Sequence, residues 1–195
     1  TMAALLERGC HLEVIVSDNG SSDGTPDMVR REFPQVVLLE SDRNIGIEAY
    51  NTGFKAARGE YVVILDDDSF PERTAVTRMV EKFRADPALG IVAFDVRNYY
   101  GYDRVAAIPK HDDSDSSTTE RYRMGFNGAG AGVRQEVFRK AGYYPGEFFL
   151  YWNEQDLSLR AMDAGYRIRF FSDIVSYHKY SPANRSSRRA PYYYC

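Results

Sequence analysis

Three short apolar segments in the first third of the chain, each followed by a helical pattern, constrain the fold more than any other feature. Buried strands are predicted over residues 12–16, 36–39 and 61–65, because these runs are aliphatic or β-branched and too short for helices. The stretches that follow them carry helix signals, at 25–33, 47–58 and 72–85. Because strands and helices alternate over short connections, the sequence predicts an α/β fold with an open, mostly parallel sheet flanked by helices.

Composition and charge limit the classes of protein to which this chain can belong. The 195 residues are 44% hydrophobic and 27% charged, which is typical of a globular domain, and no apolar run approaches the ~20 residues of a membrane-spanning helix. The formal net charge of −3 argues against broad attachment to nucleic acid. Cys10 and Cys195 lie near opposite ends without metal-ligand spacing, which favours a reducing compartment and therefore the cytoplasm.

The sequence predicts a single domain over residues 1–180, followed by a tail over 181–195. The tail is basic and aromatic and has no core pattern. A polar stretch without periodicity at 110–120 predicts a surface loop between the two halves of the domain. Beyond that loop, helices are predicted at 135–141 and 154–164 and a strand at 167–171.

Three consecutive aspartates follow the strand predicted at 61–65. Asp66 and Asp68 are two positions apart, so their side chains are expected to project to the same side. Such a carboxylate pair suits a hard cation, Mg²⁺ or Mn²⁺, which commonly also binds substrate phosphates. The alternative is an acidic helix cap in a solvated turn. We favour the metal site, because three adjacent carboxylates repel one another without a cation.

Two further clusters follow the neighbouring strands. The turn that starts at Asp18 is rich in groups able to reach a base or a ribose, although a plain tight turn explains it almost as well; its candidate ligand residues are Asp18, Asn19, Gly20 and Ser21. In the segment from Arg43 to Gly46, the arginine is suited to meet a phosphate or to order an aspartate. The glycine would allow close backbone approach, and helix capping explains the segment equally well.

An aromatic run and two acids mark the start of the helix predicted at 154–164. Glu154 and Asp156 are two positions apart and point to different sides of a helix, so only one of them is expected to act as a base. Trp152 lies in this aromatic run, directly before the acidic segment. His178, considered alone, is more typical of a packed or solvated histidine than of a metal ligand.

Taken together, these motifs resemble those of bacterial family 2 glycosyltransferases with the GT-A fold. The likeness extends over nearly the whole chain and is greatest to rhamnosyltransferase-like members that build cell-surface polysaccharides. It rests on motifs that occur in the family's order, at 18–25, 44–46, 51–53, 66–68, 127–134, 148–151, 156–160, 165–166 and His178. Each motif is weak alone, and their combination is specific.

The resemblance implies that this is an inverting, metal-dependent enzyme that moves a sugar from a UDP- or dTDP-linked donor to a glycan or lipid-linked acceptor. Donor binding would fall within about 1–98 and acceptor binding within about 121–180. The implied donor residues are Asp18, Asn19, Gly20, Ser21, Arg43, Asn44, Gly46, Asp66 and Asp67. The implied metal ligands are Asp66, Asp68 and His178, and the implied acceptor residues are Asn127, Gly128 and Trp152. Glu154 is the implied base, with Asp156 as the other candidate.

Three departures from the family pattern bear on these expectations. The chain begins in what resembles the helix after the family's first strand, so that strand is expected to be missing from the sheet. Asn153 stands where the family usually has an acid. Residues 188–194 resemble the lead-in to a membrane-associated helix, which implies peripheral association of the full protein with the inner face of a membrane. A sugar-1-phosphate nucleotidyltransferase and a non-catalytic glycan-binding or scaffold module are the alternatives.

Overall fold

The computed structural model describes residues 12–100 and 120–179, and the strands of this part form two sheets. The smaller sheet pairs β1 (Ile15–Asp18) with β2 (Val37–Glu40) in parallel. The larger sheet has six strands in the order β3-β7-β5-β8-β4, with β6 also paired to β8. Its strands are β3 (Tyr61–Ile64), β4 (Ser69–Pro71), β5 (Leu89–Asn98), β6 (Glu120–Tyr122), β7 (Ala131–Arg134) and β8 (Arg167–His178).

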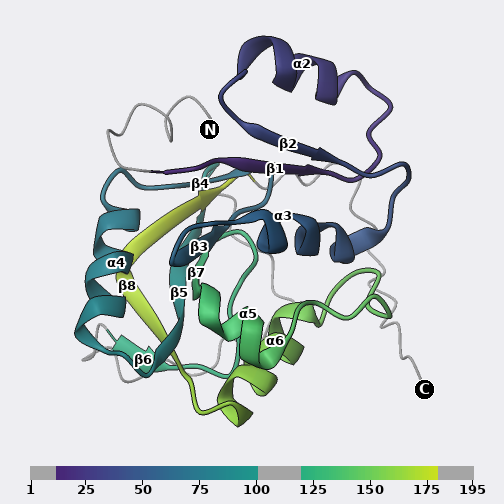
Figure 1. Ribbon diagram of the computed structural model, residues 1–195. Coiled ribbons are helices and arrows are strands. Elements are labelled where there is room, and N and C mark those ends of the chain that lie inside the picture. The colour runs from purple at the N-terminus through teal and green to yellow at the C-terminus, as the bar shows by residue number, and fades with distance from the viewer. Residues whose placement is uncertain (1–11, 101–119, 180–195) are drawn as a thin grey trace.

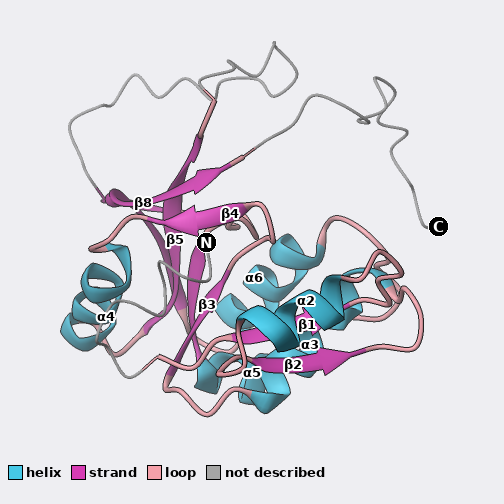
Figure 2. Cartoon of the chain, turned by 90° about the horizontal axis from the view of Figure 1, so that it is seen from above, coloured by secondary structure: helices cyan, strands magenta, loops and turns pink. Residues whose placement is uncertain are grey.

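Helices cover both faces of the larger sheet, and one more helix contacts β2 of the smaller sheet. They are α2 (Thr25–Glu32), α3 (Tyr50–Ala56), α4 (Ala75–Ala85), α5 (Gln135–Ala141) and α6 (Asn153–Asp163), and a 3₁₀ turn, η1 (Gly46–Ala49), leads into α3. In Figure 2, α4 lies on one side of the sheet and α3, α5 and α6 lie on the other. The alternation along β5 separates two cores: Ile91 and Ala93 pack with the three helices, whereas Val92 and Phe94 pack with α4.

The α/β class expected from the sequence is confirmed, and one detail of the sheet differs. β1 with β2 and β5 with β8 are parallel pairs, but β7 runs antiparallel to both of its neighbours, and β4 and β6 run antiparallel to β8. A single crossover helix between two strands is what makes neighbours parallel. β4 and β7 each follow a loop instead of a helix, so the alternation seen in the first half does not extend to them.

The two sheets are not joined by hydrogen bonds between strands in the described part of the chain. Among residues 12–100 and 120–179, no strand pairs with β1 on the edge opposite β2, or with β3 on the edge opposite β7. Helix α3 contacts β1 directly and so links the small sheet to the body of the domain (Figure 1). The Thr52 hydroxyl lies 3.2 Å from the Ser17 hydroxyl, and a Cβ at Gly53 would lie only 2.8 Å from that same Ser17 oxygen.

Several sequence predictions concern residues that the structure does not describe. The tail over 181–195, its segment 188–194, Cys10, Cys195 and the polar stretch at 110–120 all lie outside the described residues. Within the described ranges, none of the helices is long and apolar enough to cross a membrane.

Candidate active site

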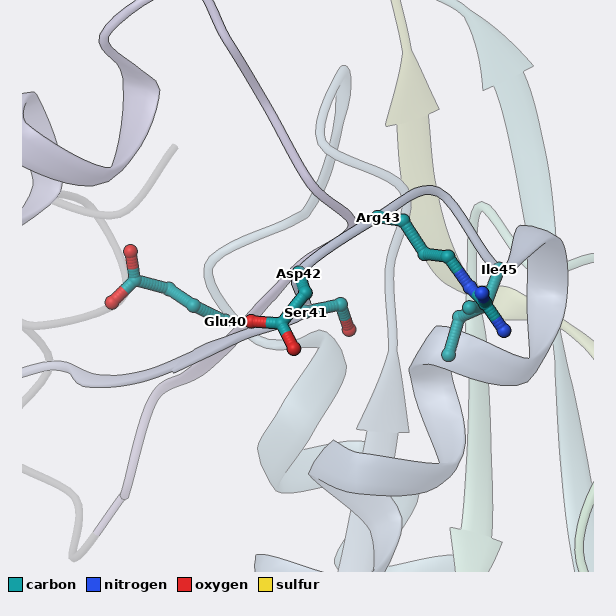
Figure 3. A pocket seen from close by; sticks show the side chains of 5 residues that line it. All are labelled: Glu40, Ser41, Asp42, Arg43 and Ile45. Atoms are coloured by element: carbon teal, nitrogen blue, oxygen red, sulfur yellow. The ribbon is translucent and has the colours of Figure 1, made fainter.

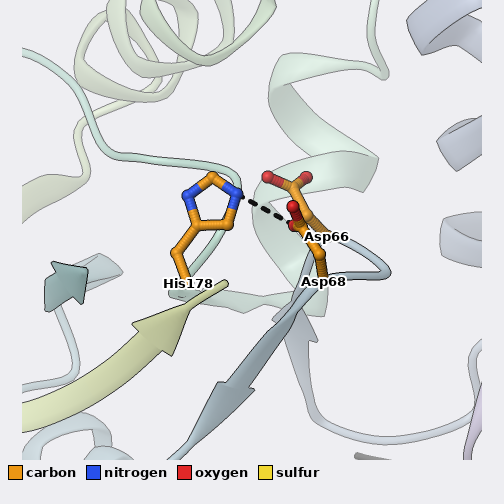
Figure 4. Close-up of side chains that lie close together, drawn as sticks. All are labelled: Asp66, Asp68 and His178. Atoms are coloured by element: carbon orange, nitrogen blue, oxygen red, sulfur yellow. Dashed lines mark ion pairs between the residues drawn. The ribbon is translucent and has the colours of Figure 1, made fainter. Parts of the chain in front are cut away.

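Asp66, Asp68 and His178 come together at one end of the larger sheet. The aspartates lie in the loop from β3 to β4, and the histidine is the last residue of β8. Because β4 pairs with β8 in a register that sets Ser69 opposite His178, the residue before Ser69 is brought to the imidazole. His178 Nε2 lies 2.9 Å from Asp68 Oδ1 (Figure 4), and one ligand atom from each of the three residues lies within 4.8 Å of the others.

The donor set of this cluster fits a divalent cation. Two carboxylates and one imidazole are a ligand combination that Mn²⁺ accepts, and Mg²⁺ prefers the oxygen ligands. Burial raises the pKa of Asp66, and the neighbouring Asp68 and Asp67 raise it further, whereas a hydrogen bond from Tyr50 lowers it. A cation would therefore stabilise the ionised form of a carboxyl group that its surroundings disfavour.

Tyr50 is a site residue that sequence reasoning missed. Its hydroxyl donates a hydrogen bond to Asp66 Oδ1 at 2.9 Å, and burial raises the pKa of this tyrosine well above its usual value. In the sequence it is one of the apolar residues on the face of the predicted helix at 47–58. The feature that could have identified Tyr50 from the sequence is its hydroxyl, since a tyrosine on the buried face of a helix usually needs a polar partner.

Glu154, from the second half of the chain, lies close to Asp66 of the candidate metal cluster. It is the second residue of α6, and a Cβ added to Gly128 would lie 2.9 Å from Glu154 Oε1 and 3.6 Å from Asp66 Oδ1. Both carboxyl groups therefore face the backbone at Gly128. Burial raises the pKa of Glu154, with a smaller contribution from Asp66. Asn127 shapes this turn, because its Oδ1 accepts a hydrogen bond from the Ala129 N–H at 2.9 Å.

Asp156 lies in a different environment from Glu154. Its Oδ2 accepts hydrogen bonds from Arg160 Nε at 2.9 Å and from Arg160 Nη2 at 2.5 Å. The same guanidinium also donates to the carbonyl oxygens of Ala141 and Tyr143. Asp156 is thus engaged in a structural ion pair, which favours Glu154 as the free carboxylate. Asn153 is buried, with 1% of its surface exposed.

The predicted donor residues of the first half form two loops that pack together. Asp18 is buried, and its Oδ2 accepts a hydrogen bond from the Ser21 N–H at 3.0 Å. A Cβ at Gly20, where φ is +75°, would lie 2.7 Å from the Arg43 carbonyl carbon, so the two loops touch through their backbones. Asp67 is exposed beside the metal cluster.

The side-chain amide of Asn19 ties these two loops together. It donates to Asn44 Oδ1 at 2.9 Å and to the Gly46 carbonyl at 3.0 Å, and its Oδ1 accepts from the Ile45 N–H at 2.8 Å. Beside the second loop is a cavity of about 370 Å³ (Figure 3), whose lining residues are Glu40, Ser41, Asp42, Arg43 and Ile45. Arg43 thus lines a space next to the other predicted donor residues.

Trp152 lies at the start of α6 in an unusual backbone conformation. Tyr151 and Trp152 have φ values of 73° and 66°, which lie in the left-handed region of backbone conformation that residues other than glycine rarely adopt. The indole is 63% exposed, so it is accessible to a ligand instead of being packed in the core.

The fold and the carboxylate–histidine cluster are those of an α/β enzyme with a candidate metal site. The family model described as "Glycosyl transferase family 2" matches residues 1–154. This chain therefore belongs to glycosyltransferase family 2, as the sequence motifs indicated.

The sequence is also similar to those of named glycosyltransferases and polysaccharide biosynthesis proteins. The chain is 27% identical over 185 residues to glycosyltransferase AglE of Haloferax volcanii, covering 87% of this chain and 57% of AglE. It is 40% identical over 95 residues to the succinoglycan biosynthesis protein ExoO of Rhizobium meliloti, covering 48% of this chain and 27% of ExoO. The chain thus spans little more than half of AglE and about a quarter of ExoO.

Solved structures of glycosyltransferases have the same fold. The mannosyltransferase PcManGT from Pyrobaculum calidifontis, in complex with GDP-Man and Mn²⁺, superposes with a TM-score of 0.69 at 27% identity, covering 89% of this chain and 49% of that one. The Staphylococcus aureus TarS 1–349 complex with UDP-GlcNAc gives a TM-score of 0.71 at 17% identity, covering 100% of this chain and 56% of that one. The second likeness, at its lower identity, concerns the fold alone.

Proposed function

We propose that this chain is an inverting, metal-dependent glycosyltransferase that uses a nucleotide-diphosphate sugar, UDP- or dTDP-linked, and a glycan or lipid-linked acceptor. The observation that carries the proposal is the meeting of Glu154 and Asp66 at Gly128, beside the three candidate metal ligands. One carboxyl group from each half of the chain thus faces a common point. The PcManGT complex, which contains GDP-Man and Mn²⁺, supports both the metal and the class of donor.

The residues of the site have distinct roles in this proposal. Asp66, Asp68 and His178 would hold the cation, which supplies charge neutralisation for the departing diphosphate. Tyr50 holds the Asp66 carboxylate in place through its hydroxyl. Glu154 takes the proton from the acceptor hydroxyl as that oxygen attacks the anomeric carbon.

The inverting outcome is the one that the resemblance to the family implies. Attack by the acceptor oxygen on the face opposite the leaving diphosphate inverts the anomeric configuration in one displacement. This route needs one base, and Glu154 serves as that base because Asp156 is paired with Arg160. The two acids at the start of α6 are therefore assigned a catalytic and a structural role.

The two substrates are assigned to the two halves of the chain. The loops at 18–21 and 43–46, with Asp66 and Asp67, contact the nucleotide and its phosphates, and the cavity beside Arg43 lies on this donor side. Trp152, with its exposed ring, stacks on a sugar of the acceptor, and Asn127 and Gly128 form the floor of the acceptor site. The full protein is proposed to act in the cytoplasm at the inner face of a membrane.

Calorimetry with free nucleotides and a sugar-transfer assay test the proposal. UDP and dTDP, with GDP for comparison, are titrated with and without Mn²⁺, and release of nucleotide from the matching sugar donors is followed. Glu154→Gln is expected to lower turnover about 10²- to 10⁴-fold and to leave nucleotide binding intact. Asp156→Asn is expected to lower stability while turnover persists.

Three outcomes would contradict the proposal. Nucleotide binding that does not depend on Mn²⁺ would remove the metal site. Binding without any release of nucleotide would indicate a glycan-binding or scaffold module with this fold. Release of pyrophosphate from a nucleoside triphosphate and a sugar phosphate would indicate a nucleotidyltransferase instead.

A further inference from the structure

The strained pair Tyr151 and Trp152 is separated from the proposed base Glu154 only by Asn153, and its backbone conformation needs a constraint from its surroundings. Two consecutive residues with side chains in the left-handed region cost on the order of 1 kcal/mol each, and such conformations persist only where the surroundings impose them. The side chains supply only part of that constraint, because residues 149–152 are all more than half exposed, although the Phe149 ring lies beside Gly46. The rest of the constraint must therefore come through the backbone.

The backbone of this segment is anchored on both sides of the strained pair. On one side, the Phe149 carbonyl accepts a hydrogen bond from the Ile47 N–H at 2.9 Å. On the other, the Trp152 carbonyl accepts from the Asp156 N–H at 2.9 Å, which is the first hydrogen bond of α6. The segment between α5 and α6 thus rests on η1, at the start of α3 (Figure 1).

Gly46 permits the first of these anchors by its lack of a side chain. A Cβ at this position would lie 2.2 Å from the Phe149 carbonyl oxygen and 2.8 Å from a ring carbon of the same residue. Its φ of +67° also favours glycine. The Gly46 carbonyl is in turn held by the Asn19 amide at 3.0 Å, and its N–H by Asn44 Oδ1 at 2.8 Å.

We propose that Gly46 is a positioning residue for catalysis. Because it has no side chain, the Phe149 carbonyl can pack against it, and this contact keeps Tyr151 and Trp152 in their strained conformation. That conformation in turn fixes Trp152 and Glu154 opposite the candidate metal ligands. The loop that ends in Gly46 belongs to the donor side, so this contact joins donor and acceptor sides at the backbone. The inference rests on the proposed role of Glu154 as base. It predicts that a change at Gly46 acts on the acceptor side.

Trp152 is the only tryptophan of the chain, which makes the test direct. Gly46→Ala is compared with Gly165→Ala, a matched control in which φ is +89° and an added Cβ meets nothing within 4 Å. The fluorescence anisotropy of Trp152 is expected to fall in Gly46→Ala, because the released segment moves on the nanosecond timescale, and to stay unchanged in the control. At saturating sugar donor, turnover should fall about 10²-fold in Gly46→Ala, beyond any change in the Mn²⁺-dependent affinity for nucleotide.

The possible results separate this inference from the proposed function. Anisotropy and turnover in Gly46→Ala equal to those of Gly165→Ala would overturn the inference, and so would a fall in turnover that weaker nucleotide binding fully accounts for, because Gly46 would then act through the donor site alone. If Glu154→Gln leaves turnover unchanged, the proposed base is wrong, and the seating of the segment is then judged by anisotropy alone. If Gly46→Ala does not fold, Asn19→Ala removes the hydrogen bonds that hold the loop and must lower the anisotropy in the same way.

Discussion

Asn51 joins the two halves of the chain by a pair of buried hydrogen bonds. Its Nδ2 donates to the Tyr144 carbonyl at 2.8 Å, and its Oδ1 accepts from the Tyr144 N–H at 3.0 Å. The two residues are 6% and 4% exposed. Asn51→Ala removes both bonds at once and leaves a backbone donor and a backbone acceptor buried without partners, so it is a sharp probe of how strongly α3 is fixed to the loop before α6.

The expected cost follows from the two orphaned groups. Each buried polar group left without a partner costs about 1–3 kcal/mol, and partial entry of water lowers the sum, so the free energy of unfolding should fall by about 3 kcal/mol. Small domains have only about 5–15 kcal/mol to lose, so the change is easily measured. Asn51→Asp keeps the acceptor but loses the donor and buries a charge, and it should cost at least as much.

Equilibrium unfolding in urea, followed by far-UV circular dichroism, measures these changes. Lys55→Ala is the control, because Lys55 lies on the same helix with its ammonium exposed and 5.2 Å from the centre of the Tyr143 ring. It should cost less than about 1 kcal/mol. A loss of less than about 1 kcal/mol in Asn51→Ala would refute the reasoning, since it would mean that the backbone groups of Tyr144 find other partners at little cost.

Three other variants test the metal cluster and the core. Tyr50→Phe removes the hydrogen bond to Asp66, worth about 1 kcal/mol, so the affinity for Mn²⁺ should fall about fivefold in a calorimetric titration; an unchanged affinity would show that Asp66 is held without it. Asp68→Asn should abolish the Mn²⁺-dependent part of UDP binding, and equal heats with and without Mn²⁺ in the parent chain would contradict this. Gly90→Ala puts a Cβ 2.6 Å from Tyr166 Cβ and should lower stability by about 1–3 kcal/mol in thermal melts, unless the sheet relaxes around it.

The sequence predicted most elements of the first half, because β1 and β2 are each followed by a helical segment, but it did not predict the short strand β4 between β3 and α4. The strand predicted at 61–65 is β3 at Tyr61–Ile64, and the helix predicted at 25–33 is α2 at Thr25–Glu32. The direction of β7 could not be predicted in the same way. It depends on which strands the chain meets on returning to the sheet, and this is a long-range property that local periodicity does not contain.

The candidate metal site was predicted in part. Asp66 and Asp68 followed from their spacing at the end of a strand, whereas His178 entered only through the resemblance to a family, because nothing local brings residues so distant in sequence together. Their proximity arises from the pairing of β4 with β8. Tyr50 was missed because its place in an apolar stripe explained it fully without its hydroxyl.

Gly46 shows how much of a glycine's role can be inferred from the sequence alone. A close approach to the backbone was one of the two interpretations that the sequence left open at this position, and the structure shows such an approach. The sequence could not tell that the approaching group is the carbonyl of Phe149, more than a hundred positions further along the chain. A glycine in a motif can indicate a close contact, but only the tertiary structure identifies the group that makes it.

The pairing of Ser69 with His178 has a consequence for how such a chain can diverge. Because the ladder of backbone hydrogen bonds aligns β4, which directly follows Asp68, with β8, which ends in His178, the segments between β4 and β8 can gain or lose residues without moving these two candidate ligands. A one-residue insertion within β4 or β8 would instead turn the ligand side chain to the opposite face of the sheet. Evolution can therefore remodel the intervening segments while the candidate metal site is inherited intact.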